Sequence, residues 1–370
     1  MKVAFHVDQL WFRVPGGIGT YVRELAPRLA MGPGVEVVPF RSSWPSDRRV
    51  AWTVPTHGVT TGRHTIRYPL WDLVGWPPLP AALVGCDLVH ATNPSAVPPA
   101  RPGQRLVVTV HDLAFEHFPD AFPSRWRWLY RAGIRAAARR ADAILVPSEA
   151  TATDLAARSD VDASKVVVTP LAPSTGVGTS DPAETLEQLG IRRPYVLSVG
   201  TLEPRKNVAR LIRAFRHVAS ELPHTLVLAG PSGWKVQGIV AELGDPPGRI
   251  EHTGVVSPEQ LDALYRAGDA FCYPSLYEGF GLPVLEAMQR GTPVVASTTP
   301  AVAEVAGDAA LLVDPTNEEA IAEALRRILT DPALADDLRR RGRERAAEFS
   351  WDGTARATLE AYRSLVGRAS

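Results

Sequence analysis

Two adjacent cations, Arg205 and Lys206, stand where a helix is expected to begin. They follow an apolar run that predicts a strand, and Asn207 is a suitable N-cap for a helix from Val208 onward. Cations at a helix N-terminus are disfavoured by roughly 0.3–1 kcal/mol each unless an anion lies between them and the helix. A diphosphate would offset this cost through charge-assisted hydrogen bonds, so the pair is a candidate diphosphate site. The alternative is an exposed pair that points into water.

Two carboxylates flank a second candidate anion site. Glu278 precedes a glycine-containing loop made of Gly279, Phe280, Gly281 and Leu282. Pro283 suits the first turn of a helix, whose free backbone N–H groups attract anions. Glu286 lies within the first turns of this helix, so both carboxylates are candidates to accept hydrogen bonds from the hydroxyls of a ribose or a hexose. The alternative is that Glu286 only favours the helix dipole and that Glu278 is solvated.

The first half of the chain holds a candidate histidine and a glycine-rich segment. His111 follows the apolar run Leu106–Val110, at the carboxyl end of a predicted strand, where it either faces a ligand or only bonds to backbone. Gly17 and Gly19 lie in a loop after the first strand and suggest a dinucleotide fingerprint. Val22 stands where the third glycine of that fingerprint belongs, so the sequence disfavours an NAD site. A plain tight turn is the remaining alternative.

One predicted helix, Ser124–Arg140, combines aromatic and basic residues. Trp126, Leu129 and Ile134 follow helical spacing, while several arginines lie elsewhere on the helix. The pattern fits a surface helix that meets anionic lipid or a lipid-diphosphate acceptor, or else a helix with one core face and one solvated face. Seven of the nine tryptophans lie in residues 11–128, which favours carbohydrate stacking there, although core packing is the commoner use.

Short, continuous apolar runs separated by helical patterns must position these residues. Such runs are typical of parallel strands covered on both faces by helices. The predicted strands are Val3–Val7, Leu106–Val110, Ala143–Val146, Val166–Val168, Tyr195–Val199, Thr225–Ala229, Ile250–Thr253, Ala270–Tyr273, Val294–Ala296 and Ala310–Val313. We therefore expect an α/β protein made of two doubly wound, Rossmann-like domains.

A stretch rich in turn formers separates the two halves. It predicts domains at residues 1–172 and 184–348, a linker at 173–183 and a C-terminal helical segment at 349–370. At 370 residues and 45% apolar composition, the chain is long enough for two ordinary cores.

Charge and cysteine content exclude several classes of protein. Lysine plus arginine and aspartate plus glutamate both number 40, so no overall basic field favours nucleic acid. Cys86 and Cys272 are expected to be free, buried thiols in a reducing compartment. Without a recognisable signal peptide or an apolar run of membrane-spanning length, the chain is expected in the cytoplasm, where it is also able to rest on the inner face of the membrane.

The segments Gly200–Asn207 and Glu278–Glu286 together resemble glycosyltransferase family 4, a group of retaining enzymes with the two-domain GT-B fold. The resemblance is carried by Gly-Thr-Leu-Glu-Pro-Arg-Lys-Asn and by two glutamates separated by seven residues. It extends over nearly the whole chain. The chain departs from the family at residues 172–174, which are Ala-Pro-Ser where the family often has Gly-Val-Asp.

The resemblance implies roles for the candidate residues. It makes Arg205 and Lys206 diphosphate contacts, Glu278 a contact to the donor sugar and Glu286 a contact to the ribose. Gly230 and Val255 would border the base pocket, His111 would lie near the reacting sugar, and Gly17 would let backbone approach the donor phosphates or the acceptor. It also implies an acceptor-side N-terminal domain that faces the donor domain across a cleft, with the C-terminal helix returning to it.

The implied activity is transfer of a hexose from a nucleotide sugar to a saccharide or lipid-linked acceptor in polysaccharide biosynthesis, with retention of the anomeric configuration of the sugar. The variant of the cation motif resembles that of mannosyltransferases, so GDP-mannose is the first expected donor and UDP-sugars the second. No cofactor, metal or nucleic acid is expected: Asp160 and Asp162 fit turn chemistry, and the leaving charge would be met by cations and N–H groups. The alternatives are a nucleotide-sugar epimerase, a sugar phosphorylase or a non-catalytic scaffold that binds sugar nucleotides.

Overall fold

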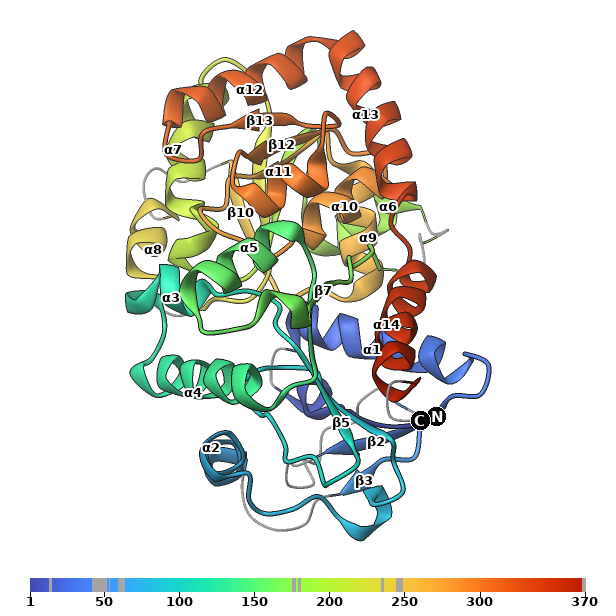
Figure 1. Cartoon of the computed structure of the whole chain (residues 1–370). Helices are drawn as coiled ribbons and strands as arrows, with labels where there is room; N and C mark the ends of the chain where they lie inside the picture. Colours follow the sequence, from blue (N-terminus) through green and yellow to red (C-terminus); the bar gives the residue numbers. More distant parts are fainter. Residues whose placement is uncertain are drawn as a thin grey trace. The chain divides into compact units, whose positions relative to one another are not determined.

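The chain forms two compact units, each a parallel sheet with helices on both faces (Figure 1). The first unit contains Met1–Leu171 and Ser350–Ser370, and the second contains Ala172–Phe349. The computed structural model describes residues 1–12, 15–41, 52, 54–58, 64–174, 178, 181–233, 236–243 and 249–367.

The first unit is built on a seven-stranded sheet in the order β3-β2-β1-β4-β5-β6-β7. Its strands are β1 (Lys2–His6), β2 (Glu36–Arg41), β3 (His57–Gly58), β4 (Leu88–Ala91), β5 (Arg105–Thr109), β6 (Ala143–Val146) and β7 (Val166–Val168). Successive strands are added on one side of β1 as far as β3 and then, from β4 onward, on its other side. The strand order therefore reverses between β1 and β4. Open parallel sheets bind ligands at such a switch point, beyond the carboxyl ends of the strands.

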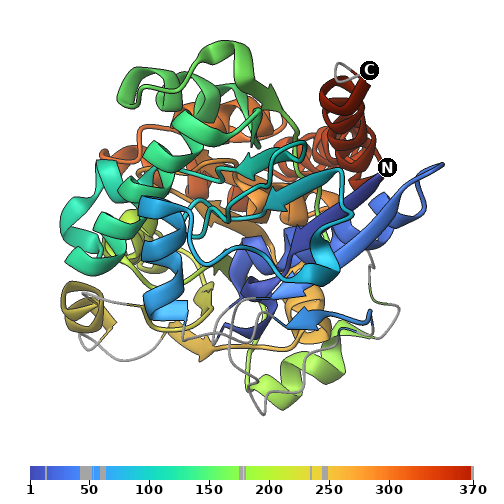
Figure 2. The same ribbon diagram turned by 60° about the horizontal axis from the view of Figure 1, so that its bottom comes forward.

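Helices cover both faces of this sheet. They are α1 (Gly16–Ala30), α2 (His64–Val74), α3 (Ala114–His117), α4 (Ser124–Arg140), α5 (Glu149–Arg158) and α14 (Trp351–Val366), with 3-10 turns η1 (Asp8–Trp11), η2 (Ala81–Leu83), η3 (Pro119–Ala121) and η4 (Ala163–Lys165). Helix α1 packs on α14, and α2 packs on α4. Right-handed crossovers put α2, α4 and α5 on one face and α1 on the other. The start of β1 and the end of α14 lie on the same side of the unit (Figure 2).

The second unit has a six-stranded sheet in the order β10-β9-β8-β11-β12-β13, with its switch point between β8 and β11. Its strands are β8 (Tyr195–Val199), β9 (Thr225–Ala229), β10 (Ile250–Gly254), β11 (Ala270–Tyr273), β12 (Val294–Ser297) and β13 (Leu311–Val313). Its helices are α6 (Pro182–Leu189), α7 (Val208–Ala219), α8 (Gln237–Leu243), α9 (Pro258–Ala267), α10 (Leu282–Gln289), α11 (Pro300–Ala306), α12 (Glu318–Thr330) and α13 (Pro332–Ala347), with the 3-10 turn η5 (Pro204–Lys206).

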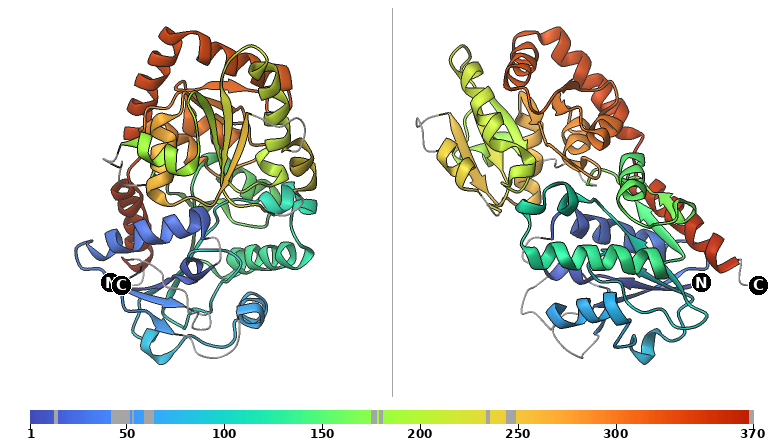
Figure 3. Two further views of the ribbon diagram at one scale, coloured as in Figure 1. Left: turned by 180° about the vertical axis from the view of Figure 1, so that it is seen from behind. Right: turned by 60° about the vertical axis from the view of Figure 1, so that its left-hand side comes forward.

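The core of the second unit explains its layering. Leu211, Ile212 and Phe215 recur at helical spacing on α7, and all three are buried against Ile321 and Leu325 of α12 and against the sheet. Helices α10 and α13 pack together, as do α6 and α9. The sheet is therefore enclosed between two helical layers, which both views of Figure 3 show.

All ten predicted strands are present, each within one residue at either end. Within the residues that the structure describes, three further strands lie outside the prediction: β2, β3 and β4. Pro39 interrupts the pattern of β2, and β3 has only two residues. In β4, His90 interrupts an apolar run of four residues. The side chain is nevertheless fully buried, because its ring forms hydrogen bonds with the hydroxyl groups of Tyr362 and Thr109.

The glycine-rich segment after β1 is not the loop that the sequence predicts. Helix α1 already begins at Gly16, and Gly17 and Gly19 belong to its first turns. Five buried residues on this helix provide an apolar face that outweighs the poor helix propensity of glycine: Tyr21, Val22, Leu25, Ala26 and Leu29. A side chain at position 19 would place its Cβ 2.4 Å from the Cβ of Pro15.

The packing of α4 gives a test of the fold. A Cβ on Gly133 would lie 1.5 Å from the carbonyl oxygen of Pro94. Gly133→Ala therefore forces α4 away from the backbone at Pro94, although alanine has a better helix propensity than glycine. We expect it to lower the free energy of unfolding by about 3 kcal/mol or more in urea titration. The control is Gly85→Ala, where no atom lies within 4 Å of the added Cβ. Equal stability of the two variants would contradict this packing.

Candidate functional site

The predicted diphosphate and sugar residues meet at the switch point of the second unit. Strands β8 and β11 are parallel neighbours, so the loops at their carboxyl ends lie at the same edge of the sheet. Arg205 and Lys206 follow β8, and Glu278 follows β11. This edge is where doubly wound sheets place their ligands.

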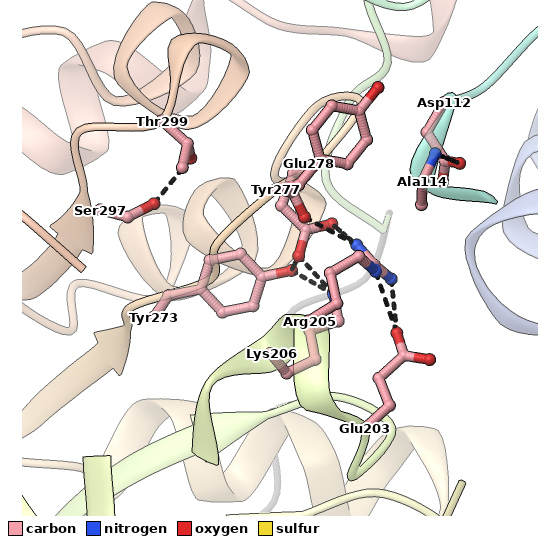
Figure 4. A network of polar contacts seen from close by, with 10 residues as sticks. All are labelled: Asp112, Ala114, Glu203, Arg205, Lys206, Tyr273, Tyr277, Glu278, Ser297 and Thr299. Carbon is pink, nitrogen blue, oxygen red and sulfur yellow. Dashed lines mark hydrogen bonds and ion pairs between the residues drawn. The ribbon is translucent and has the colours of Figure 1, made fainter. Parts of the chain in front are cut away.

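Glu278 binds both cations, as Figure 4 shows. Its Oε2 lies 2.7 Å from Nη1 of Arg205, and its Oε1 lies 2.6 Å from Nζ of Lys206. Arg205 also donates to Glu203 Oε1 at 2.7 Å and to the carbonyl oxygen of Tyr277 at 2.9 Å. The four charged side chains are at most 13% exposed. We call Glu203, Arg205, Lys206 and Glu278 the ion cluster.

Tyr273, the last residue of β11, completes the ion cluster. Its hydroxyl accepts a hydrogen bond from Lys206 Nζ at 2.6 Å and donates one to Glu278 Oε1 at 2.9 Å. The Lys206 ammonium also lies 4.9 Å from the centre of the Tyr273 ring, within cation–π range. Lys206 is thus held between a carboxylate, a hydroxyl and an aromatic ring.

The charges of the ion cluster balance one another: two cations face two carboxylates. Burial alone would raise the pKa of Glu278, but Arg205 and Lys206 outweigh it and hold that pKa at about 2. Burial, together with the neighbouring Arg205, lowers the pKa of Lys206. Glu278 therefore remains ionised at neutral pH and acts as an internal counter-ion, a role that the sequence does not predict for it.

Asn207 is not the side-chain N-cap that the sequence predicts. It adopts a left-handed conformation, with φ 60°, and among the described residues its side chain accepts no capping hydrogen bond from the backbone of α7. Its Nδ2 instead donates to the carbonyl oxygens of Pro274 and Pro315, at 3.0 and 2.6 Å. Because Pro274 follows β11, Asn207 ties the loop after β8 to the loop after β11.

Glu286 belongs to a different polar group. Its Oε1 accepts from Ser174 Oγ at 3.1 Å, and its Oε2 accepts from the Tyr265 hydroxyl at 3.2 Å. Burial raises its pKa, the opposite direction to Glu278. The two glutamates are therefore brought to neighbouring elements, but they are held by separate partners.

The loop between Glu278 and α10 is shaped by backbone and packing. Gly281 stands at the N-cap position with φ 114°, a conformation that favours glycine, and Leu282 opens the helix ahead of Pro283. The Phe280 ring is 5% exposed and packs edge-on against Phe349. Any ligand contact of Phe280 would therefore come from its backbone. Gly279 lies between Glu278 and this packed ring.

Gly230 and Val255 follow β9 and β10, on the other side of β8 from Glu278. A Cβ on Gly230 would lie 2.1 Å from the carbonyl oxygen of Gly200, so this glycine lets two strand-ending loops touch. The Val255 side chain is 73% exposed. In the described part of the chain, neither Gly230 nor Val255 forms a hydrogen bond or an ion pair with the ion cluster.

His111 lies in the first unit, just past β5, and bonds to backbone. Its Nε2 is 3.0 Å from the carbonyl oxygen of Thr92, which follows β4, and its ring meets the Tyr21 ring edge-on with centroids 5.0 Å apart. Burial lowers the pKa of His111, which favours a neutral imidazole. The Tyr21 hydroxyl is held in turn, 3.0 Å from Thr109 Oγ1. Gly17 lies in α1 four residues before Tyr21, and a Cβ added there would meet no atom within 4 Å outside the neighbouring helix backbone.

A buried charged group at the switch point of the first unit was missed by the sequence analysis. Asp8 Oδ2 accepts from the Tyr68 hydroxyl at 2.6 Å and lies 3.1 Å from His6 Nε2. All three side chains are at most 3% exposed. The available signal was the pair of polar residues flanking Val7 at the end of an apolar strand.

Three partners in the second unit were also missed: Glu203, Tyr273 and Ser174. Glu203 lies within the cation motif, and Tyr273 is the polar end of a predicted strand that precedes Glu278. Those positions were the available signals. Ser174 lies in the predicted linker, so no local pattern connects it with Glu286.

Comparison with known proteins identifies the class. The description "Glycosyltransferase Family 4" matches residues 15–172, and "Glycosyl transferases group 1" matches residues 183–345. A sucrose-phosphate synthase from Thermosynechococcus elongatus has a similar structure, with a TM-score of 0.77, 26% identity and full coverage of both chains. The chain is a glycosyltransferase, of the hexosyltransferase class, with the GT-B fold.

It belongs to glycosyltransferase family 4. It is 35% identical over 271 residues to an O-antigen chain mannosyltransferase B of Escherichia coli, covering 71% of each chain. It is 33% identical over 289 residues to an MMP alpha-(1->4)-mannosyltransferase of Mycolicibacterium hassiacum, covering 73% of this chain and 67% of that one. Over the residues that the structure describes, no helix combines the length and the apolar character needed to span a membrane.

Proposed function

We propose that this glycosyltransferase transfers mannose from GDP-mannose to a saccharide or lipid-linked acceptor, with retention of the anomeric configuration. The ion cluster at the switch point of the second unit carries the proposal. Its two cations stand where the donor diphosphate of a doubly wound domain is expected. The relatives named mannosyltransferases support mannose as the sugar.

Donor binding is an exchange of counter-ions. Without ligand, Glu278 takes one hydrogen bond from each cation. A diphosphate that approaches Arg205 and Lys206 replaces those bonds with several charge-assisted bonds to its own oxygens and releases the Glu278 carboxylate to accept from a sugar hydroxyl. Diphosphate binding and sugar binding are thereby coupled through a single side chain.

The chemistry needs no protein nucleophile in this proposal. The bond between the sugar anomeric carbon and the diphosphate oxygen breaks, and the acceptor oxygen bonds to the same carbon from the same face. The acceptor proton passes to the leaving diphosphate oxygen. Arg205 and Lys206 stabilise the charge that develops on that oxygen, and no metal is required. His111, neutral at physiological pH, serves as a hydrogen-bonding residue toward the reacting sugar.

The donor is tested by thermal shift with a panel of GDP- and UDP-sugars. At 100-fold excess over its dissociation constant, the correct donor stabilises the protein by about 2.7 kcal/mol, and we expect GDP-mannose to do so. The variant Lys206→Ala lacks the charge-assisted contact to the diphosphate, so we expect its affinity for the donor to fall by about 10- to 100-fold. The control is Lys165→Ala in the first unit. Unchanged affinity in Lys206→Ala would place the diphosphate elsewhere.

The counter-ion exchange predicts opposite effects on binding and turnover. Glu278→Gln leaves the two cations less neutralised, so we expect GDP to bind on the order of 10-fold more tightly in calorimetry. Transfer falls on the order of 100-fold because the sugar contact weakens. The matched control is Glu286→Gln, which leaves the charge of the ion cluster intact and does not tighten GDP. If GDP binds Glu278→Gln more weakly than the native protein, the exchange does not occur.

The stereochemistry of the product tests the reaction class. We expect proton NMR of the new glycosidic linkage to show the anomeric configuration of the donor, because departure and attack use one face. An inverted linkage would refute the front-face reaction. Formation of an isomerised nucleotide sugar in the absence of acceptor would instead indicate an epimerase.

A further inference from the structure

Four buried polar side chains form a continuous series across the first unit, and the proposed transfer reaction gives them no role. The hydroxyl of Tyr362, on α14, lies 2.5 Å from Nδ1 of His90, on β4. The Nε2 atom of the same imidazole lies 2.7 Å from the hydroxyl of Thr109, the last residue of β5. The Thr109 hydroxyl in turn lies 3.0 Å from the hydroxyl of Tyr21, on α1. We call Tyr362, His90, Thr109 and Tyr21 the buried polar network.

The geometry of β5 brings the buried polar network to His111. Beyond the strand, the Val110 N–H donates to the carbonyl oxygen of Leu145 at 2.9 Å, so the backbone continues the strand pairing. Residues two apart in extended backbone point to the same face, which places Thr109 and His111 on one face. Helices α1 and α14, which carry the two tyrosines of the network, pack on each other (Figure 1). The Tyr21 ring meets the His111 ring edge-on, with centroids 5.0 Å apart, so the network reaches His111 through a ring contact.

Burial makes each member of the network depend on the next. All four side chains are at most 2% exposed, so each hydrogen bond is supplied by a neighbouring side chain rather than by bulk water. Burial also lowers the pKa of His90 to about 3, so its imidazole is neutral. A neutral imidazole has one N–H and one lone pair, so one of its two hydroxyl partners donates to it and the other accepts from it. Displacing one member therefore leaves a buried polar group without its partner.

The backbone fixes the other side of the His111 ring. Its Nε2 lies 3.0 Å from the carbonyl oxygen of Thr92, which can only accept a hydrogen bond. Burial lowers the pKa of His111, so in the favoured neutral ring Nε2 carries the hydrogen and Nδ1 carries the lone pair. Among the described residues, Nδ1 has no hydrogen-bond partner. The bond to Thr92 and the contact with the Tyr21 ring thus leave one accepting nitrogen for a hydroxyl of a ligand.

We propose that His90 and Tyr362 are positioning residues for the transfer reaction. Through Thr109 they hold the Tyr21 ring against His111, whose Nδ1 accepts a hydrogen bond from a hydroxyl of the reacting sugar. This inference rests on the proposed function and deepens the role given there to His111. A displacement of about 1 Å at a reacting centre costs on the order of 100-fold in rate, so side chains that never touch the sugar are able to control turnover.

Two amide substitutions of His90 separate positioning from packing. The amide of glutamine reaches the place of the imidazole Nε2 and still bonds to Thr109, whereas the shorter asparagine reaches the place of Nδ1 and bonds only to Tyr362. Steady-state kinetics use the donor that thermal shift identifies. We expect kcat to fall about 10-fold or more in His90→Asn but only about 3-fold in His90→Gln, with the donor KM unchanged in both. Equal kcat values in the two variants, or a rise in KM that accounts for the loss, would overturn the proposal.

A milder variant tests the same claim if the His90 variants do not fold. Tyr362→Phe keeps a fully buried ring and removes only the hydroxyl that bonds to His90, so we expect kcat to fall about 3- to 10-fold at unchanged donor KM. The matched control is Thr358→Val, which removes another fully buried hydroxyl of α14, one that donates to the carbonyl oxygen of Thr354. We expect this control to lower the thermal midpoint without lowering kcat. Equal losses of kcat in the two variants would reduce the network to a structural role.

A third measurement does not depend on the reaction. In the full chain labelled with nitrogen-15 at histidine, NMR assigns His111 as the ring signal that disappears in His111→Gln. We expect the native ring to carry its hydrogen on Nε2, and its signals to shift or broaden in Tyr362→Phe but not in Thr358→Val. Unchanged His111 signals in Tyr362→Phe would refute the hold of the network on this ring. A native chain that transfers sugar from no donor would instead contradict the proposed function, and the NMR result would still decide whether the network positions His111.

Discussion

The shared ion pair of Glu278 with Arg205 and Lys206 is the constraint on which the candidate site of the second unit depends. Two cations that are at most 13% exposed require a counter-charge, since an uncompensated buried charge costs several kcal/mol. Glu278 supplies it from the neighbouring strand loop. The Tyr273 hydroxyl adds a hydrogen bond to Glu278, and Asn207 joins the two loops by donating to the carbonyl oxygen of Pro274. The loops after β8 and β11 are thus held in a fixed relation before any ligand arrives, which limits the ordering cost of binding.

The same interaction sets a requirement on the ligand. A monoanion would not displace a bidentate carboxylate that already binds both cations, whereas a diphosphate brings more charge and more acceptor oxygens. In the proposed function, the ion cluster therefore selects for the charge density of the ligand before the sugar is recognised. It also couples the two parts of the proposed donor, because the carboxylate that would leave the cations is the one assigned to the sugar.

Much of this arrangement could be predicted from the sequence, because carboxyl ends of parallel strands share an edge. Arg205, Lys206 and Glu278 each follow a continuous apolar run, so their meeting follows from the fold class. The ion pairs between them cannot be predicted from the fold class, because they depend on the loop conformations that bring a carboxylate within 3 Å of two cations. Asn207 illustrates the limit: its type suits an N-cap, but a left-handed φ redirects its side chain to Pro274. Strand β4 was missed for a similar reason, because buried His90 is satisfied by Tyr362, 272 positions away.

The two glutamates show why spacing alone does not assign roles. Seven residues separate them, yet cations hold the pKa of Glu278 at about 2, whereas burial raises the pKa of Glu286. Carboxyl groups whose pKa values are displaced in opposite directions are suited to different tasks. Glu278 is a charged group whose partners a diphosphate replaces in the proposed function. Glu286 accepts hydrogen bonds from the hydroxyls of Ser174 and Tyr265, and in the proposed function it accepts one from a ribose hydroxyl.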